Sequence, residues 1–235
     1  MILGIMQPYF FPYLGYFDLI NFSDRWIVFD TAQYIRHGWI NRNRILHPAE
    51  GWQYVVVPLE KHRREAEIGS IRIAGGSEWR KRILGQILHY RKRAPFFTDI
   101  YELISECLAV QEVFLARFNV HVLDKVCRYL GISFNPTFLS DMEIKLGSIT
   151  SPGDWALRIS EALGAREYVN PPGGAHLFDP KRFEELGIKL TIRNLPVLKY
   201  PCPGYVFAPN LSIIDVLLWN PRDTVRNFLD TCNPV

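Results

Sequence analysis

The first 29 residues, MILGIMQPYFFPYLGYFDLINFSDRWIVF, decide the fold class. The apolar run Ile2–Met6 ends at Gln7-Pro8 and predicts a buried strand that leads into a turn. Residues 13–22 follow Pro12 and carry apolar side chains at helical spacing, and proline is compatible with the first turn of a helix. Residues 26–29 predict a second buried strand. Strand, turn, helix and strand in this order indicate a βαβ unit with parallel strands.

The downstream sequence continues this alternation of strand and helix. Predicted strands lie at residues 53–58, 68–73, 134–139, 167–169 and 188–193, and residues 31–50 are expected to form a loop. Predicted helices lie at residues 78–93, 99–110, 112–130, 155–163, 180–186, 212–218 and 222–231. Because no repeat or long linker interrupts the chain, we expect one α/β domain over residues 1–235, with a parallel sheet and a helical insertion at residues 78–130.

The composition is that of a globular protein, with 48% hydrophobic and 22% charged residues. No apolar run reaches the ~20 residues that a membrane-spanning helix needs, and the amino terminus does not resemble a signal peptide. We therefore expect a cytoplasmic protein without a membrane span. Cys107, Cys127, Cys202 and Cys232 form no CxxC pair and the six histidines have no ligand spacing, so we predict no metal site.

The formal net charge of +3 conceals an uneven distribution of charged residues. Residues 61–93 hold ten of the 27 basic residues but only three of the 24 acidic ones. This stretch is either a solvated helical surface or a positive face that attracts phosphates or nucleic acid. RNA binding is therefore one functional hypothesis, and it depends on this stretch alone.

Two groups of polar and aromatic residues follow the first two predicted strands. The first group includes Gln7, Tyr9 and Tyr16, and the second includes Gln33, His37, Trp39, Asn41, Arg42 and Asn43. The carboxyl ends of parallel strands meet at one edge of a sheet, where ligands of α/β proteins bind. Carboxamides, rings and a guanidinium suit a ligand that combines an anion with a flat group. The alternative is a rigid, well-packed turn, and a hydrogen-bonded structural role for His37.

Two later segments have weaker signals. Residues 170–176, Asn-Pro-Pro-Gly-Gly-Ala-His, bring glycines that allow close backbone approach, but a plain turn explains them better. In residues 207–215, Ser212 is suited to cap a helix with Asp215 three residues later. No nucleophile and base are paired by a recognisable motif, so composition and spacing alone indicate an α/β protein that binds an anionic, partly aromatic ligand.

Blocks spread along the chain carry a family resemblance. They are IMQPYFFPYLGYFDLI at 5–20, FDTAQY at 29–34, HGWINRNRI at 37–45, WQYVVVPL at 52–59, HYRKRAPFF at 89–97, residues 164–178, and FAPNLSIIDVLLWN at 207–220. With these blocks in this order, the sequence resembles the WbqC-like protein family. The family's positions map onto Gln7, Pro8, Tyr16, Asp24, Gln33, Trp39, Asn41, Arg42, Asn43, Pro58, Tyr90, Tyr168, Ser212 and Asp215. One departure is Phe-Pro-Tyr at residues 11–13, where the family pattern has Leu-Pro-Trp.

The start of the chain is also similar to nucleotidylyltransferases and adenylate-forming enzymes of the HIGH type. These enzymes carry Gly-His where this chain has Gly15-Tyr16, and Ser212-Ile-Ile-Asp215 loosely matches their late phosphate-binding segment. The similarity implies a Rossmann-like core of the HIGH-type nucleotidyltransferase kind. The missing histidine removes one contact to a triphosphate.

The resemblance to WbqC-like proteins implies a role in bacterial surface-polysaccharide (O-antigen, lipopolysaccharide) synthesis. The implied activity is transfer of an acyl or aminoacyl group, such as glycyl, to a nucleotide-activated amino sugar. Because an amide does not form from a free acid and an amine in water, the donor needs ATP with magnesium or an aminoacyl-tRNA. The alternative is a non-catalytic module that binds sugar nucleotides or assists an assembly complex.

Under the transferase hypothesis, each candidate residue has an expected role. We expect Arg42 to bind the anion, Gln7 and Asn43 to orient the substrate, and Tyr16 or Trp39 to stack on it. His37 is the candidate general base, with Asp24 and Asp215 orienting their neighbours. The remaining candidate substrate contacts are Tyr9, Gln33, Asn41, Tyr90, Tyr168 and Ser212.

Overall fold

The computed structural model describes residues 1–232. Its strands are β1 (Ile2–Met6), β2 (Arg25–Val28), β3 (Arg42–Leu46), β4 (Trp52–Val56), β5 (Pro136–Phe138), β6 (Glu167–Asn170) and β7 (Lys189–Ile192). Its α-helices are α1 (Leu14–Phe22), α2 (Glu78–Ile87), α3 (Phe97–Ala109), α4 (Leu115–Leu130), α5 (Pro152–Ala162), α6 (Pro180–Glu185), α7 (Ile213–Trp219) and α8 (Arg222–Thr231). Short 3₁₀ helices are η1 (Ile68–Ser70), η2 (Leu88–Tyr90), η3 (Leu139–Asp141) and η4 (Pro172–Leu177).

Five of the strands form one parallel sheet in the order β5-β2-β1-β6-β7. The predicted βαβ unit is confirmed, since β1 and β2 are adjacent, parallel and joined by α1. Numbered along the chain, the five strands lie in the order 3-2-1-4-5, which is that of a doubly wound, Rossmann-like sheet. The strand order therefore reverses between β1 and β6.

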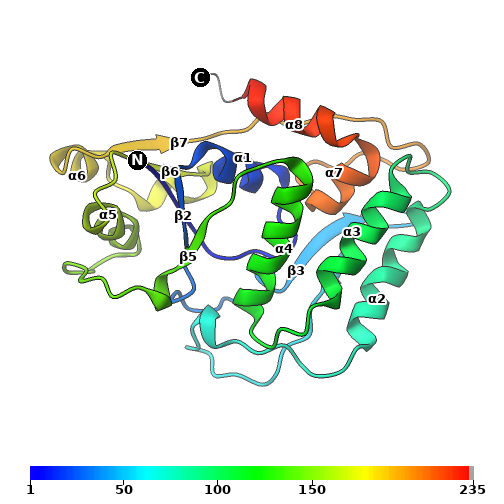
Figure 1. The fold of residues 1–235 in the computed structure, drawn as a ribbon, viewed down its shortest axis with the longest axis horizontal. Helices are drawn as coiled ribbons and strands as arrows, with labels where there is room; N and C mark the ends of the chain where they lie inside the picture. Colours follow the sequence, from blue (N-terminus) through cyan, green and yellow to red (C-terminus); the bar gives the residue numbers. More distant parts are fainter. Residues whose placement is uncertain (233–235) are drawn as a thin grey trace.

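The two faces of the sheet pack against different helices (Figure 1). Leu3, Ile5 and Tyr168 point to the face covered by α5 and α6, where they form one apolar cluster. Trp26 and Val169 point to the opposite face, where they belong to a larger cluster with residues of α1, α4 and α7. This alternation along short strands with both faces covered explains why β1, β2 and β6 read as nearly continuous apolar runs.

Two predictions about the segment between β2 and α2 are wrong. Residues 31–50 are not a loop throughout, because Arg42–Leu46 is strand β3, which pairs antiparallel with β4 in a separate two-stranded sheet. Asn43 occupies a buried position in β3, so the strand lacks the alternation of apolar and polar residues that would reveal it. Residues 68–73 are not a strand; they begin with η1, whose Gly69 N–H donates to the Asp30 carbonyl at 2.8 Å.

Helices α2, α3 and α4 occupy residues 78–130, as predicted, and Gly131 ends α4 with a φ of 69°. Ile83, Ile104 and Phe118, one from each helix, belong to the same apolar cluster as residues of α1 and α7. We retain as a proposal that the chain is one domain with these helices as its insertion. Among residues 1–232, no helix combines the length and apolar character required to span a bilayer.

Candidate functional site

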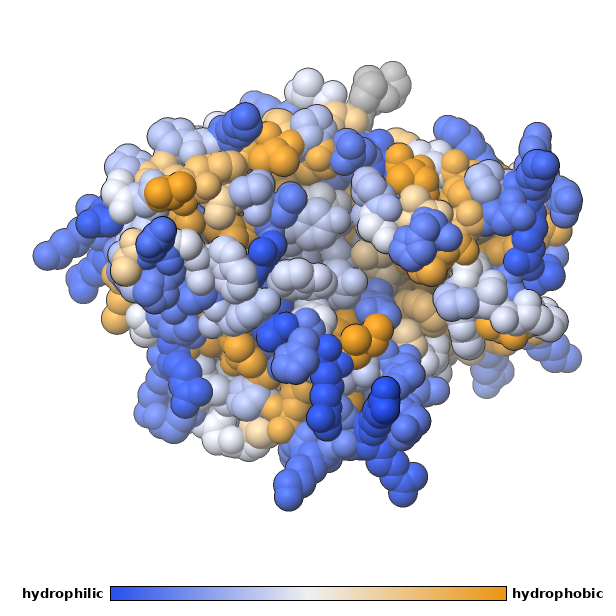
Figure 2. All heavy atoms as spheres, turned by 180° about the vertical axis from the view of Figure 1, so that it is seen from behind, coloured by the Kyte–Doolittle hydropathy of each residue, from blue (hydrophilic) through white to orange (hydrophobic). Residues whose placement is uncertain are grey.

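A cavity of about 760 Å³ lies where β1, β6 and β7 end at their carboxyl edge. Its lining includes Met6 at the end of β1 and Gln7 directly after it, Asn170 at the end of β6, and Asn194 just after β7. This is the point where the strand order reverses, which is where open α/β sheets bind ligands. The volume is within the ~300–1,000 Å³ typical of small-molecule sites. The view from behind shows a hollow near the centre of that face of the molecule (Figure 2).

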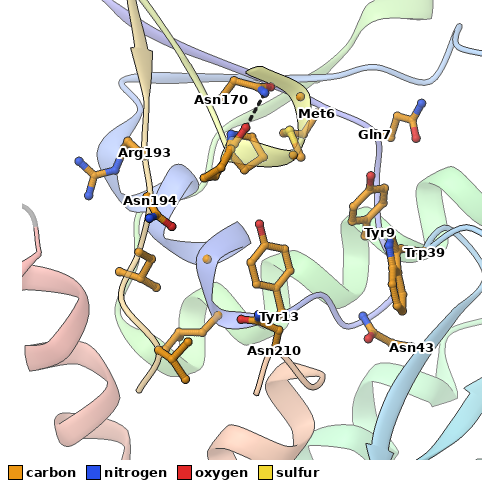
Figure 3. A pocket seen from close by; sticks show the side chains of 18 of the residues that line it. Met6, Gln7, Tyr9, Tyr13, Trp39, Asn43, Asn170, Arg193, Asn194 and Asn210 are labelled. Atoms are coloured by element: carbon orange, nitrogen blue, oxygen red, sulfur yellow. Dashed lines mark hydrogen bonds between the residues drawn. The ribbon is translucent and has the colours of Figure 1, made fainter. Parts of the chain in front are cut away.

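The wall of the cavity combines aromatic rings and carboxamides with aliphatic side chains and prolines. The rings include those of Tyr9, Tyr13, Trp39, Trp155, Tyr200 and Phe207, and the carboxamides are those of Gln7, Asn43, Asn170, Asn194 and Asn210. Tyr9 and Trp39 lie together on one wall, while Arg193 and Asn194 lie opposite (Figure 3). Tyr13 reaches in from the start of α1, and burial raises the pKa of its phenol to about 12. None of the described residues lining the cavity is Asp, Glu, His, Lys or Cys.

The first loop, residues 7–13, forms one wall of the cavity, and side chains from other elements hold its backbone. Tyr16 of α1 donates its hydroxyl proton to the Gln7 carbonyl at 2.8 Å. Asn119 of α4 is fully buried and donates to the carbonyls of Pro8 at 2.8 Å and Ile40 at 2.7 Å. One carboxamide therefore joins the first loop to the loop that follows β2, and Trp39 and Asn43 of the second predicted group line the cavity with Gln7 and Tyr9 of the first.

Phe11 is the strained residue of the first loop. Its φ is 38°, in a region that non-glycine residues rarely adopt. Its carbonyl accepts hydrogen bonds from Asn43 Nδ2 at 2.9 Å and Ser212 Oγ at 2.7 Å. Asn43 also donates to the Phe10 carbonyl at 3.1 Å. These donors from β3 and the start of α7 stabilise a backbone conformation that would otherwise be costly.

Arg44 of β3 is a cation on the cavity wall. Its guanidinium carbon lies 5.1 Å from the centre of the Trp39 ring and 5.0 Å from that of Trp52. Its Nε is buried without a hydrogen-bond partner, and one Nη donates to the Asn210 carbonyl at 3.4 Å. None of the ion pairs found among residues 1–232 includes Arg44. A guanidinium oriented by rings and lacking a carboxylate is suited to bind an anion.

Arg193 is the second arginine on the wall, but its guanidinium points away from the cavity (Figure 3). It forms a two-pronged ion pair with the buried Asp18 of α1, at 2.8 and 2.9 Å, and lies over the Phe22 ring. The pair joins the end of β7 to α1. We infer that this ion pair has a structural role, because it joins two elements that contribute residues to the cavity wall.

Asp215 of α7 is a buried carboxylate beside the cavity. It accepts hydrogen bonds from Leu46 N–H at 3.1 Å, from Tyr200 Oη at 3.1 Å and from the Tyr90 hydroxyl. Burial raises the pKa of Asp215, and these three hydrogen bonds oppose the rise. Tyr200 lines the cavity, so it connects the buried carboxylate to the cavity surface.

The family model of the WbqC-like proteins matches residues 7–227. The chain belongs to the WbqC-like protein family. It is also similar to the uncharacterized protein Rv1507c of Mycobacterium tuberculosis (strain ATCC 25618 / H37Rv), with 29% identity over 231 residues and 97% of each chain covered. No solved structure matches the chain significantly.

Five of the residues proposed for this WbqC-like protein line the cavity. They are Gln7, Tyr9, Trp39, Asn43 and Tyr168. Tyr168 is buried, with its hydroxyl donated to Asn170 Oδ1 at 2.9 Å, and Asn43 uses its amide group on the first loop. Gln7, Tyr9 and Trp39 are therefore the members of this set most available to a ligand.

Three further proposed residues build the walls from behind. Tyr16 and Ser212 hold the first loop through their hydroxyl groups, and Tyr90 donates to Asp215. Ser212 also accepts from Ile214 N–H at 3.2 Å, so the predicted helix cap is confirmed.

The remaining proposed residues lie outside the cavity lining. Asp24 accepts from Ile2 N–H at 2.7 Å, at the amino end of β1 and thus at the opposite edge of the sheet. His37 is exposed and its carbonyl accepts from Arg42. Arg42 lies over the Tyr54 ring, 4.1 Å from its centre. Gln33 donates to the Arg64 carbonyl, and Asn41 is bonded to Tyr34 and Val57.

Sequence reasoning missed Arg44, Tyr200 and Asn194. Arg44 stands two residues after Arg42, and the register of β3 against β4 places the two guanidinium groups over different rings. Because residues two apart on a strand share a face, choosing between them requires the positions of the Tyr54, Trp39 and Trp52 rings. Asn194 directly follows a predicted strand, as Gln7 does, which was a usable signal. Residues 193–211 contain no helix or strand, so no periodicity marks Tyr200.

Proposed function

We propose that this protein binds a nucleotide-activated amino sugar in the cavity and transfers an acyl or aminoacyl group to the amino group of the sugar. The observation that carries the proposal is one cavity, at the reversal of strand order, that combines aromatic rings, carboxamides and an arginine without a carboxylate partner. Family membership supports the pathway: WbqC-like proteins are associated with surface-polysaccharide synthesis.

Each part of such a ligand has a chemical counterpart in the wall. The phosphates suit Arg44, which lies on the same wall as Trp39. The planar base and the apolar face of a sugar ring suit the aromatic side chains of Tyr9, Trp39 and Phe207. The sugar hydroxyls suit the carboxamides, since an amide both donates and accepts. No side chain caps the start of α1, and the amino end of a helix favours a nearby anion.

The binding half of the proposal is tested by calorimetry with dTDP-, UDP- and GDP-linked amino sugars. Arg44→Gln should weaken the preferred nucleotide sugar about 10- to 100-fold, as expected for loss of a charge-assisted hydrogen bond. Arg42→Gln is the matched control, because Arg42 is on the same strand but lies over Tyr54. Equal loss in both variants, or in neither, would contradict this assignment of the anion contact.

The catalytic half is tested by product formation. The protein is incubated with the bound nucleotide sugar and glycine, supplied either with ATP and magnesium or as glycyl-tRNA, and the amide is detected by mass spectrometry. The wall carries no Asp, Glu, His, Lys or Cys among the described residues, which favours the second candidate function, a non-catalytic sugar-nucleotide-binding protein. Tight binding without any product from either donor would decide for that second function.

A further inference from the structure

Asp215 is surrounded by neutral donors alone. It is 1% exposed, and its two oxygens accept from Tyr200, Tyr90 and the Leu46 N–H. No ion pair among the described residues includes it. Three donors converging on two oxygens suit an ionised carboxylate, whose oxygens only accept.

This arrangement restricts the hydroxyl of Tyr200. A phenol has one proton, and Tyr200 donates it to Asp215. The Tyr200 oxygen therefore presents only lone pairs to any other group. Tyr200 is one of the residues that line the cavity, so a ligand group that reaches its hydroxyl would meet an acceptor hydrogen-bonded to the buried Asp215 carboxylate. Arg44, elsewhere on the wall, offers only donors.

We infer that Tyr200 recognises a protonated amino group of the ligand, and that Asp215 keeps the Tyr200 hydroxyl in its accepting state. An ammonium group has donors only and carries positive charge, so it fits this acceptor best. A hydroxyl group can also donate but lacks the charge, and a keto oxygen would face the Tyr200 oxygen lone pair against lone pair. This inference rests on the proposed function and assigns the residue that distinguishes an amino sugar from its neutral counterparts.

Two other polar side chains of the wall already have hydrogen-bond partners within the protein. Asn43 Oδ1 accepts from the Arg44 N–H at 2.8 Å, and Asn170 Oδ1 accepts from Tyr168 while its amide donates to the Pro171 carbonyl. None of the described residues that line the cavity carries a carboxylate. Among the described residues of the wall, Tyr200 is the one whose hydroxyl is hydrogen-bonded to a buried carboxylate.

The variant Tyr200→Phe removes the hydroxyl and keeps the ring that packs edge-on against Phe207, at 5.1 Å between centres. Tyr205→Phe is the matched control: Tyr205 is in the same segment, but its hydroxyl donates to the His89 carbonyl and it does not line the cavity. Asp215→Asn is the second variant. Its amide would donate to Tyr200, which frees the hydroxyl proton to point into the cavity.

The test is calorimetry with pairs of nucleotide sugars that differ only in an amino, hydroxyl or keto group on one ring carbon, beginning with UDP-glucosamine and UDP-glucose. The native protein should prefer the amino sugar about tenfold over the hydroxyl sugar, with the keto sugar weakest. Tyr200→Phe should lose this preference while binding the hydroxyl sugar as before, and Tyr205→Phe should keep it. Asp215→Asn should shift the preference towards the keto sugar, with thermal unfolding measured in parallel.

A preference retained in Tyr200→Phe would overturn the inference, as would a native protein that binds amino and hydroxyl sugars equally. In both cases nucleotide-sugar binding stands, so the proposed function survives. Failure of the native protein to bind any nucleotide sugar would instead refute the proposed function and the inference together.

Discussion

The two walls of the cavity are held in different ways. The first loop, residues 7–13, is held by its backbone: its carbonyls accept from the side chains of Tyr16, Asn43, Asn119 and Ser212. Residues 193–211, the closing segment, have no helix or strand and are held mainly by their own side chains. In this segment the Tyr200 hydroxyl donates to Asp215 and the Tyr205 hydroxyl to the His89 carbonyl, while Val206, directly after Tyr205, is 78% exposed.

Because the two walls are held differently, some residues hold the backbone of the first loop and others line the cavity. The proposed family positions Tyr16, Asn43 and Ser212 shape the first loop, and their polar groups are used up in doing so. Residues of the closing segment that line the cavity, such as Asn194 and Tyr200, come from a stretch without a recognisable motif. In this protein the motif residues Tyr16, Asn43 and Ser212 shape the first loop, while Gln7, Tyr9 and Trp39 line the cavity together with residues of the closing segment.

The largest expected effect comes from the ion pair that joins the two walls. In Arg193→Met the Asp18 carboxylate, which is 1% exposed, loses this guanidinium, and the free energy of unfolding should fall by about 3–5 kcal/mol. The measurement is the midpoint of urea unfolding at unchanged m-value. Arg222→Met is the control. The side chains of Arg222 and Asp223 are 57% and 80% exposed, so their ion pair should contribute little to stability. A loss no larger than that of the control would mean that the pair does not hold the walls together.

The sequence predicted the elements whose pattern is local. The runs of β1 and β2 and the helical spacing of α2 to α4 need no distant partner to be recognised, whereas β3 is defined by its pairing with β4 and by the buried Asn43. The same reason governs the site. Gln7 was found because it follows a strand, but choosing Arg44 over Arg42 required the register of β3, and finding Tyr200 required knowing that Asp215 lies beside it.

A smaller effect is expected from the first loop. Ser212→Ala removes the donor to the strained Phe11 and the acceptor that caps α7, so stability should fall by about 1–2 kcal/mol. Ser77→Ala is a matched control, because Ser77 precedes α2 without a capping hydrogen bond from its side chain. Urea unfolding of both variants measures the difference. Equal losses would show that Ser212 acts only as a residue of good cap propensity.

A pH-dependent effect on stability is expected where Tyr205 of the closing segment contacts His89. His89 Nδ1 lies 2.8 Å from the Tyr205 hydroxyl, and burial, with nearby His47 and Arg93, lowers the pKa of His89 from 6.5 to about 4. Between these two values the unfolded chain binds more protons than the folded one, so stability is complete above about pH 6.5 and declines as the pH falls towards 4. The effect should be modest, since His89 is only half-buried.

The measurement for His89 is the melting temperature from pH 7.5 to 4.5 in the native protein and in His89→Asn. The variant keeps a polar group near Tyr205 but cannot titrate, so its curve should be flatter over this window. Parallel curves would show that other groups cause the pH dependence.

The smallest effect on stability is expected at the start of α1, where shape rather than charge is tested. A Cβ on Gly15 would lie 2.5 Å from the Tyr13 ring, which projects into the cavity, whereas a Cβ on Gly85 of α2 would meet nothing within 4 Å. Gly85→Ala should therefore stabilise the protein by about 0.4–1 kcal/mol through its effect on the unfolded chain. Gly15→Ala should lose that gain, because the Tyr13 ring must move, and should weaken nucleotide-sugar binding. If Gly15→Ala instead matched Gly85→Ala in stability and left affinity unchanged, the position of Tyr13 would have no part in forming the ligand site.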